Sequence, residues 1–421
     1  MMRPAIEGGV PTRPKPWPTY DKGDVILDKE DEKLVVEALK SKLLFRYDYR
    51  PLEQTHVGKF EKSAEKFFNV KYALAVSSGT AAITLALISL DLKQDDEVAL
   101  PGFTFAATPS AVILAGAKPV LVEVDENLNF DIRDLEKKYN PKMKAVIPVH
   151  MRGSASDMEA IAEFAYQRGL SVIEDVVQAM GLKYKGRYLG TYGHFGAFSM
   201  QSDKGCNTGE GGLLVTNDDR LFAKSAILSG AYEGRWKSHF DSRHPDLDDR
   251  DYPVYSFRMD NLRGALAYSQ LKKLPARLKK LSSNYSYLIK QLSKNPKISI
   301  RKSLEQESII GDSLLFSLPE FTLDEALYFS NALRAEGISC LVFGDTNRKN
   351  IRRFWDWNFL FPELDVSERK KLLPNTVKYL ENVMDIPLSP TLAKTDLDDI
   401  VLATEKVLRY MDARRGMVVK L

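Results

Sequence analysis

Residues 171–216 read SVIEDVVQAMGLKYKGRYLGTYGHFGAFSMQSDKGCNTGEGGLLVT, and this stretch decides both the fold and the site. The run 170–174 is apolar and rich in β-branched residues, which predicts a buried strand that ends at Asp175, with Gln178 three residues later. A second buried strand is predicted over 196–200, and a polar turn that contains Lys204 follows it. Glycines then lead into a third strand over 213–216, and glycines permit the backbone to pass close to a ligand.

These residue types match the needs of one cofactor, pyridoxal phosphate. It requires a lysine for its aldehyde, an acid beside its pyridine nitrogen, a phosphate cradle and a flat side chain over its ring. Lys204 would form the Schiff base, Asp175 would hold the pyridinium proton, Gln178 could donate to the phenolic oxygen and Ser199 could reach the phosphate. A lysine alone is most often a solvated surface residue. Its combination with Asp175, Gln178 and the glycines favours the cofactor.

The bulk composition is that of an ordinary globular enzyme. A chain of 421 residues exceeds one usual core and predicts two domains. The net charge is +3 from 60 basic and 57 acidic residues that do not cluster, so we expect no nucleic-acid partner. No apolar run is long enough to span a membrane, and the start lacks the apolar core of a signal peptide. With two cysteines, which fit a reducing compartment, a cytoplasmic location is expected.

Predicted strands and helices alternate through the first two thirds of the chain. Such alternation indicates an α/β fold with a mostly parallel central sheet and helices on both faces. The proline-rich segment 1–28 predicts an extended N-terminal arm, 29–272 a large domain and 273–421 a small α+β domain. Near that boundary we expect one helix to end at Leu274 and another to begin at Leu278.

A second group of candidate residues follows the strand predicted over 72–76. The strand leads into Ser77-Ser78-Gly79-Thr80 and a helix, and the free amides of a helix start favour a phosphate. An ordinary helix cap is the alternative, and the lysine region tips the balance towards phosphate. Farther along, Phe103 and Phe105 flank one residue and point opposite ways in an extended backbone, so one could cover the cofactor ring while the other enters the core.

Three further patterns have weaker interpretations. Arg46, Tyr47 and Tyr49 could face a polyhydroxylated substrate, although surface hydrogen bonding is at least as good an interpretation. The aromatic residues of 354–361 are expected to form a local cluster of the second domain. His150 follows a predicted strand and could lie near the substrate, but no second histidine or cysteine stands at ligand spacing, so no metal is expected.

Six blocks in order carry a family resemblance: VSSGTAA (76–82), PGFTFAAT (101–108), PVHMRGSASDM (148–158), IEDVVQA (173–179), FSMQSDKGCNTGEGG (198–212) and SFRMDNLRGALAYSQL (256–271). The chain resembles the DegT/StrS family of pyridoxal-phosphate-dependent sugar aminotransferases. The resemblance implies the fold type I aminotransferase architecture and homodimers whose sites are shared between subunits.

The resemblance also implies one cofactor site formed by Gly79, Thr80, Phe105, Asp175, Gln178, Ser199, Lys204 and Ser256. Gly79 and Thr80 would hold the phosphate together with Ser199, and Phe105 would cover the ring. Ser256 stands where the family has an asparagine that reaches the phosphate of the neighbouring subunit, so this cross-subunit contact departs from the pattern.

The implied activity is transamination from glutamate or glutamine to a keto or aldehyde group of a nucleotide-linked sugar, an octulosonate-type sugar or a cyclitol. Three alternatives stay open at this point. One is a pyridoxamine-dependent sugar dehydratase, in which histidine replaces the lysine. Another is a noncatalytic regulatory member of the fold. The third is a nucleotide-binding oxidoreductase, which the absence of a G-x-G-x-x-G helix opening disfavours.

Overall fold

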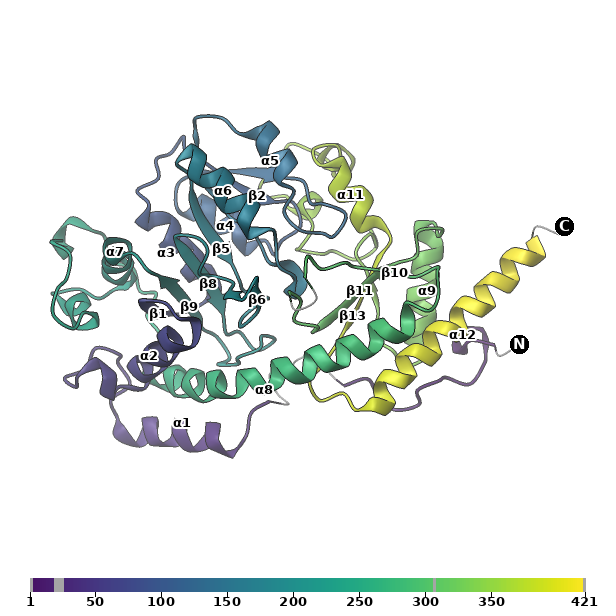
Figure 1. Ribbon diagram of the computed structural model, residues 1–421, viewed down its shortest axis with the longest axis horizontal. Coiled ribbons are helices and arrows are strands. Elements are labelled where there is room, and N and C mark those ends of the chain that lie inside the picture. Colours follow the sequence, from purple (N-terminus) through teal and green to yellow (C-terminus); the bar gives the residue numbers. More distant parts are fainter. Residues whose placement is uncertain (1–2, 19–25, 306–307, 419–421) are drawn as a thin grey trace.

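The computed structural model describes residues 3–18, 26–305 and 308–418. A seven-stranded sheet lies beside a smaller four-stranded one (Figure 1). The order in the large sheet is β1-β9-β8-β5-β4-β2-β3; β9 is antiparallel to both its neighbours, and the pairs from β8 to β3 are parallel. The strands are β1 (Tyr72–Val76), β2 (Glu97–Pro101), β3 (Lys118–Val122), β4 (Met143–Val146), β5 (Ser171–Asp175), β8 (Phe195–Ser199) and β9 (Gly212–Thr216).

Helices cover both faces of the large sheet because its apolar residues alternate between two cores. In β1, Leu74 and Val76 belong to one core, whereas Ala73 and Ala75 belong to the other. The first face carries α3 (Gly79–Ser89), α4 (Ala107–Leu114) and α7 (Asp219–Ser229). The second face carries α2 (His56–Phe68), α6 (Met158–Arg168) and the first part of α8 (Asn261–Leu292), with α5 (Ile132–Lys138) at its margin.

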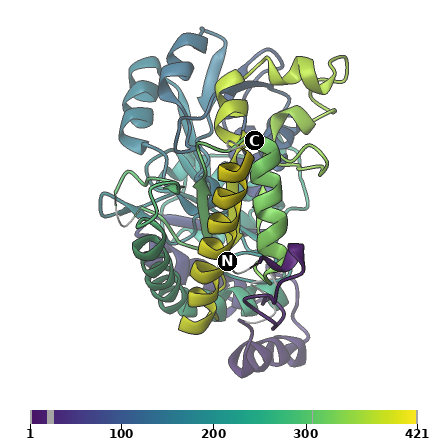
Figure 2. The ribbon, with the colours of Figure 1, turned by 90° about the vertical axis from the view of Figure 1, so that its right-hand side faces the viewer.

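The small sheet is antiparallel in the order β10-β11-β13-β12. Its strands are β10 (Ser299–Ile300), β11 (Ser313–Ser317), β12 (Leu341–Val342) and β13 (Val383–Pro387). Two helices, α9 (Leu323–Ala335) and α12 (Lys394–Val418), lie side by side (Figure 2) and share a third core with this sheet. Shorter elements are α1 (Lys29–Ser41), α10 (Val366–Lys370), α11 (Pro374–Glu381) and the hairpin of β6 (Lys183–Tyr184) and β7 (Arg187–Tyr188).

The predicted break between two helices near Leu274 is wrong. Helix α8 runs for 32 residues with Pro275 inside it (Figure 1). Proline usually breaks a helix interior, but the apolar residues around it continue at helical spacing: Leu271 and Leu274 pack in the core of the large sheet, and Leu288 in that of the small sheet. The domain boundary predicted at 272/273 therefore lies within a continuous helix, and the division into domains stays a prediction.

The aromatic residues of 354–361 pack differently from the prediction. Phe354, Trp355 and Trp357 are buried in the core that also contains Leu100 of β2 and Phe103 just beyond it, and Phe359 is half exposed. The amide of Phe354 donates to the Gly102 carbonyl at 3.1 Å, which fastens this segment at the end of β2. The segment that follows the small strand β12 thus returns to the large sheet.

Arg46 and Tyr47 do not face a substrate; both are buried. Arg46 is 1% exposed and donates to both carboxylate oxygens of Glu61, at 2.7 and 2.9 Å, and to the Ala75 carbonyl at 2.8 Å. The Tyr47 hydroxyl lies 2.9 Å from Nε2 of the buried His239. Only Tyr49 of the three is exposed, at 85%. This pairing fixes the connector 43–55 to α2 and β1.

Replacement of Glu61 by alanine is expected to lower the free energy of unfolding by about 3–5 kcal/mol, because it leaves the buried Arg46 guanidinium without a counter-charge. Urea denaturation followed by circular dichroism measures the change. Glu53→Ala is the matched control, since Glu53 is exposed on the same connector. A loss for Glu61→Ala no larger than that of the control would contradict the interpretation.

The described part of the N-terminal arm lies against the small sheet's helices. Glu336, at the end of α9, accepts hydrogen bonds from the amides of Ala5 and Thr12, both at 2.7 Å. Arg13 pairs with Asp396 of α12 at 2.6 Å. Residues 1–2 and 19–25 of the predicted arm lie outside the described residues. Within the described ranges, no helix combines the length and apolar character needed to cross a membrane.

Candidate active site

The candidate site lies at the edge of the large sheet where β1, β5 and β8 end and β9 begins. Gly212 is the register partner of both Val76 and Ser199 at this edge. Asp175 is the last residue of β5, one strand farther along. Ligands of open α/β sheets bind at the carboxyl ends of the strands, and this edge collects three such ends.

A cavity of about 390 Å³ opens at this edge. Seven of the eight predicted site residues line it: Gly79, Thr80, Phe105, Asp175, Gln178, Ser199 and Lys204. Ser256 does not; it is exposed, and its hydroxyl accepts a hydrogen bond from Arg258 at 3.1 Å. The structure therefore brings the lysine and the acid to one concavity, as the sequence predicts.

Asp175 is held by two hydrogen bonds. Thr108 of α4 donates to Oδ2 at 2.9 Å, and the Val177 amide donates to Oδ1 at 3.1 Å. Thr104 in turn lies 2.8 Å from the Thr108 hydroxyl. Burial raises the pKa of Asp175, and the hydrogen bonds from Thr108 and Val177 oppose that rise. The two donors therefore favour the charged carboxylate that a protonated pyridine nitrogen requires.

Thr108→Val is expected to reduce kcat roughly tenfold, because it removes a hydrogen bond to the Asp175 carboxylate. Loss of this donor raises the pKa of Asp175 further, so the acid limb of the kcat–pH profile should move to higher pH. Measuring the profile for the wild type and the variant tests both effects. Thr108→Ser retains the hydroxyl and should restore the wild-type limb; an unshifted limb in the valine variant would refute the assignment.

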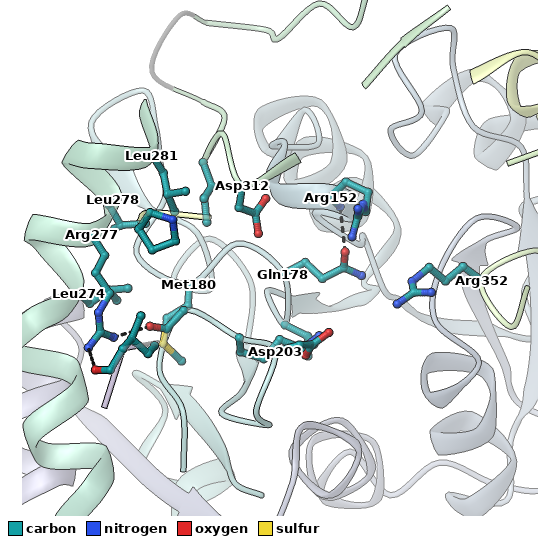
Figure 3. Close-up of a pocket in the computed structure, with 16 residues that line it drawn as sticks. Arg152, Gln178, Met180, Asp203, Leu274, Arg277, Leu278, Leu281, Asp312 and Arg352 are labelled. Atoms are coloured by element: carbon teal, nitrogen blue, oxygen red, sulfur yellow. Dashed lines mark hydrogen bonds and ion pairs between the residues drawn. The ribbon is translucent and has the colours of Figure 1, made fainter. Parts of the chain in front are cut away.

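Lys204 lies in the turn between β8 and β9. Its Nζ is 2.7 Å from Asp203 Oδ1. The next residue, Gly205, accepts a hydrogen bond through its carbonyl from Arg277 of α8 at 2.7 Å. A smaller hollow of about 40 Å³ adjoins the cavity here, and Figure 3 shows Arg277 reaching from α8 on one side and Arg352 pointing in from the other. Helix α8 thus contacts the turn that contains Lys204 through the Arg277 side chain.

Gln178 is oriented by the segment that follows β4. Its Oε1 accepts from the Arg152 amide at 3.2 Å, the contact drawn in Figure 3. Arg152 has a left-handed backbone with φ 54°, and its guanidinium pairs with Asp385 of the small sheet. The small sheet therefore holds Arg152, and Arg152 holds Gln178.

The start of α3 has the geometry of a phosphate cradle. Ser78 caps the helix by accepting from the Ala81 amide at 3.0 Å, and the first amides of a helix have no partner within it. A Cβ on Gly79 would lie 2.9 Å from Ser199 Cβ and 3.1 Å from Val177 Cγ2, so only glycine allows the helix start to approach β8 this closely. The cradle, the acid and the lysine together fit pyridoxal phosphate.

Phe103 and Phe105 have the opposite orientations that the sequence predicts. Phe103 is fully buried, whereas Phe105 is 44% exposed and lines the cavity. The Arg352 guanidinium carbon lies 5.9 Å from the centroid of the Phe105 ring.

Thr108, Glu210 and Arg352 are among the lining residues to which the sequence assigned no role. Thr108 had a usable signal, since Thr104 and Thr108 stand four residues apart in the segment between the strand end at Pro101 and the start of α4. Glu210 lies within the glycine-rich run before β9. Arg352 had no local signal, because it enters the cavity from a segment about 150 residues beyond Lys204.

Residues 25–405 match the model of the DegT/DnrJ/EryC1/StrS aminotransferase family. The chain belongs to this family. Its members carry pyridoxal phosphate, so the cofactor predicted from Lys204 and Asp175 is confirmed, as is the transaminase class of the enzyme. The predicted α/β class and the fold type I architecture are confirmed as well.

Three relatives illustrate the range of the family. The spore coat polysaccharide biosynthesis protein SpsC of Bacillus subtilis (strain 168) is 31% identical over 401 residues, which cover 92% of this chain and 96% of that protein. GDP-perosamine synthase of Escherichia coli O157:H7 is 37% identical over 219 residues, 52% of this chain and 58% of that protein. The solved structure of S. venezuelae DesV in complex with a ketimine intermediate is 25% identical with a TM-score of 0.75, over 90% of this chain and 94% of that one.

Proposed function

We propose that this aminotransferase moves an amino group from glutamate or glutamine to a keto or aldehyde group of a sugar or cyclitol. The observation that carries the proposal is the convergence of Lys204, Asp175 and the α3 phosphate cradle on one cavity. Relatives named for polysaccharide biosynthesis and for GDP-perosamine synthesis support a sugar as the acceptor.

In this proposal each group of site residues has a separate function. Gly79 and Thr80, at the helix start, bind the phosphate with Ser199. Asp175 keeps a proton on the pyridine nitrogen, and Thr108 keeps Asp175 charged. Bound pyridoxal phosphate supplies an electron sink next to the reacting carbon.

Lys204 performs the proton transfer. Its Nζ takes the proton from the donor carbon that bears the amino group and later delivers a proton to the acceptor carbon. Asp203 Oδ1 lies 2.7 Å from this Nζ and provides a carboxylate beside it. Phe105 covers one side of the cavity and limits the access of water.

The same site residues distinguish the proposed aminotransferase from two alternative functions. A pyridoxamine-dependent dehydratase has histidine in place of the lysine, and this chain has Lys204. A noncatalytic member has no need for the proton-handling set of Lys204, Asp175 and Gln178, all of which line the cavity here.

The decisive experiment is the isolated donor half-reaction. Purified holoenzyme is mixed with glutamate or glutamine, and the absorbance of the cofactor is followed in a stopped-flow instrument. We expect a conversion with one of the two donors and recovery of the starting spectrum on addition of 2-oxoglutarate or 2-oxoglutaramate. A spectrum that neither donor changes would rule out transamination by this chain.

We also propose that two copies form a homodimer in which Ser256 contributes to the partner's site. Ser256 is exposed and lies outside its own cavity, next to the exposed Val254 and Tyr255. Analytical ultracentrifugation tests the assembly, and a sedimenting species of one chain at micromolar concentration would contradict it.

A further inference from the structure

A second cavity, of about 370 Å³, adjoins the candidate site. It lies between the small-sheet strands β12 and β13 and the segment 343–353. Arg352 lines both this cavity and the one that contains Lys204, so the two spaces meet at its side chain. A molecule bound at Lys204 can therefore extend past Arg352 into the second cavity, which we call the outer cavity.

The outer cavity is strongly cationic. Of the residues that the structure describes, five cationic side chains line it against two carboxylates, Asp345 and Asp385. Asp385 is already engaged with Arg152 and accepts a hydrogen bond from Ser313 at 2.5 Å. Asp345 Oδ2 lies 3.4 Å from Arg348 Nε, which is a long distance for an ion pair. The carboxylates thus leave an excess of positive charge.

The excess positive charge belongs to the segment 343–353, whose backbone is held in place by hydrogen bonds. Arg353 is 1% exposed and donates to the carbonyls of Phe343, Asp345 and Arg348 at 2.7, 2.8 and 2.7 Å, and it pairs with Asp356. These bonds fix the course of 343–353, so the neighbouring cations are presented to the cavity by a fastened backbone.

Two of these cations lack an anionic partner. Across the described ranges, neither Lys349 nor Arg352 forms an ion pair with a carboxylate. The Nε of Arg352 is also buried without a hydrogen-bond acceptor. A buried donor left without an acceptor is costly unless a ligand supplies one. The unpaired positive charges and the unsatisfied Arg352 Nε therefore both favour a bound anion in the outer cavity.

We propose that the outer cavity is an anion subsite for the amino-group acceptor, and that the acceptor is a sugar bearing a carboxylate or a phosphate group. This inference rests on the proposed function. Arg352 and Lys349 bind the anion, and Arg348 adds charge at the rim. A neutral cyclitol would leave these cations unpaired, whereas an anionic sugar matches them.

The acceptor fits this subsite better than the amino donor does. The α-carboxylate of an amino acid is attached to the reacting carbon, so it must stay inside the cavity that contains Lys204. Arg348 and Lys349 line only the outer cavity. A ligand that reaches them from Lys204 must therefore carry an anionic group away from its reacting carbon. Of the two proposed donors only glutamate has one, its γ-carboxylate, and the donor half-reaction measured below separates this case from an anionic acceptor.

The test is calorimetric titration of the holoenzyme with three probes: UDP, D-gluconate and the neutral myo-inositol. We expect one of the two anions to bind, with an affinity that falls as salt rises. Binding of UDP identifies a nucleotide-linked acceptor, and binding of D-gluconate identifies a sugar acid. Failure of both anions, or binding of myo-inositol instead, overturns the proposal.

The double variant Arg348→Gln/Lys349→Gln should weaken binding of the same anion by about tenfold or more, since each lost charge removes a charge-assisted contact. Lys290→Gln, an exposed cation on α8 away from both cavities, is the matched control and should bind as the wild type does. Unchanged affinity in the double variant overturns the proposal.

Donor chemistry is measured on the same proteins. The loss of anion affinity in the double variant should exceed any slowing of the glutamate or glutamine half-reaction by at least tenfold. Equal losses would assign the cations to the donor and overturn the acceptor assignment. A wild type that binds the anion but converts neither donor would instead refute the proposed function.

Discussion

Lys204→Ala is expected to lower kcat for transamination by at least about 10⁴-fold, because it removes the amine that moves the substrate proton. Among the described residues, Lys204 is the single lysine that lines this cavity. The variant should still bind the cofactor noncovalently, since the α3 cradle and Asp175 are unchanged. Stopped-flow absorbance measures the half-reaction, and equilibrium dialysis measures cofactor binding.

Two controls separate chemistry from folding in this variant. Borohydride reduction of the wild type should add the mass of the cofactor to the peptide that contains Lys204, and the variant should gain no such mass. Added methylamine should restore part of the lost rate if the side-chain amine is what is missing. A variant with near wild-type turnover would refute the role assigned to Lys204.

Asp175→Asn should reduce kcat by about 10²–10³-fold, the usual cost of removing one preorganised electrostatic group from a buried site. The amide occupies the same space and keeps the Thr108 contact, but it cannot hold a proton on the pyridine nitrogen. Because burial raises the pKa of Asp175, its ionised form depends on the donors around it, and the asparagine removes that charge altogether.

Glu210→Gln is the matched control for Asp175→Asn, because Glu210 is another carboxylate that lines the same cavity. We expect its kcat to stay within about threefold of the wild type, since Glu210 is exposed and screened by water. Steady-state kinetics on both variants provides the comparison. Equal losses in the two would show that general negative charge, rather than the position of Asp175, is required.

The strand pattern of the large sheet could be predicted from sequence because each strand is a short apolar run that ends in a polar turn. The strands expected over 72–76 and 213–216 lie within one residue of the observed ones. The continuity of α8 could not be predicted, because a proline in mid-sequence is a strong local sign of a helix end, and only packing against two cores overrides it.

In the candidate site, too, residues with a local sequence signal could be predicted and residues placed by long-range packing could not. Asp175 and Lys204 could be predicted because each follows a strand end, and strand ends of a parallel sheet meet at one edge. Arg352 could not, since its place depends on Phe354 and Trp355 packing back onto β2, a long-range contact that no local pattern encodes. The roles of Arg46 and Tyr47 could not be predicted for a related reason: Arg46 pairs with Glu61 inside the next helix, and the Tyr47 hydroxyl lies against His239, 192 residues farther along the chain.

Helix α8 has a mechanical consequence. At 32 residues it is about 48 Å long, and this one continuous helix packs against both the large and the small sheet. One end is embedded beneath the large sheet, the middle braces the turn after the lysine through Arg277, and the far end is anchored in the small sheet's core. A chain truncated after Leu271 would lose this brace together with the second sheet, so the first two thirds of the protein should not survive as an independent cofactor-binding module.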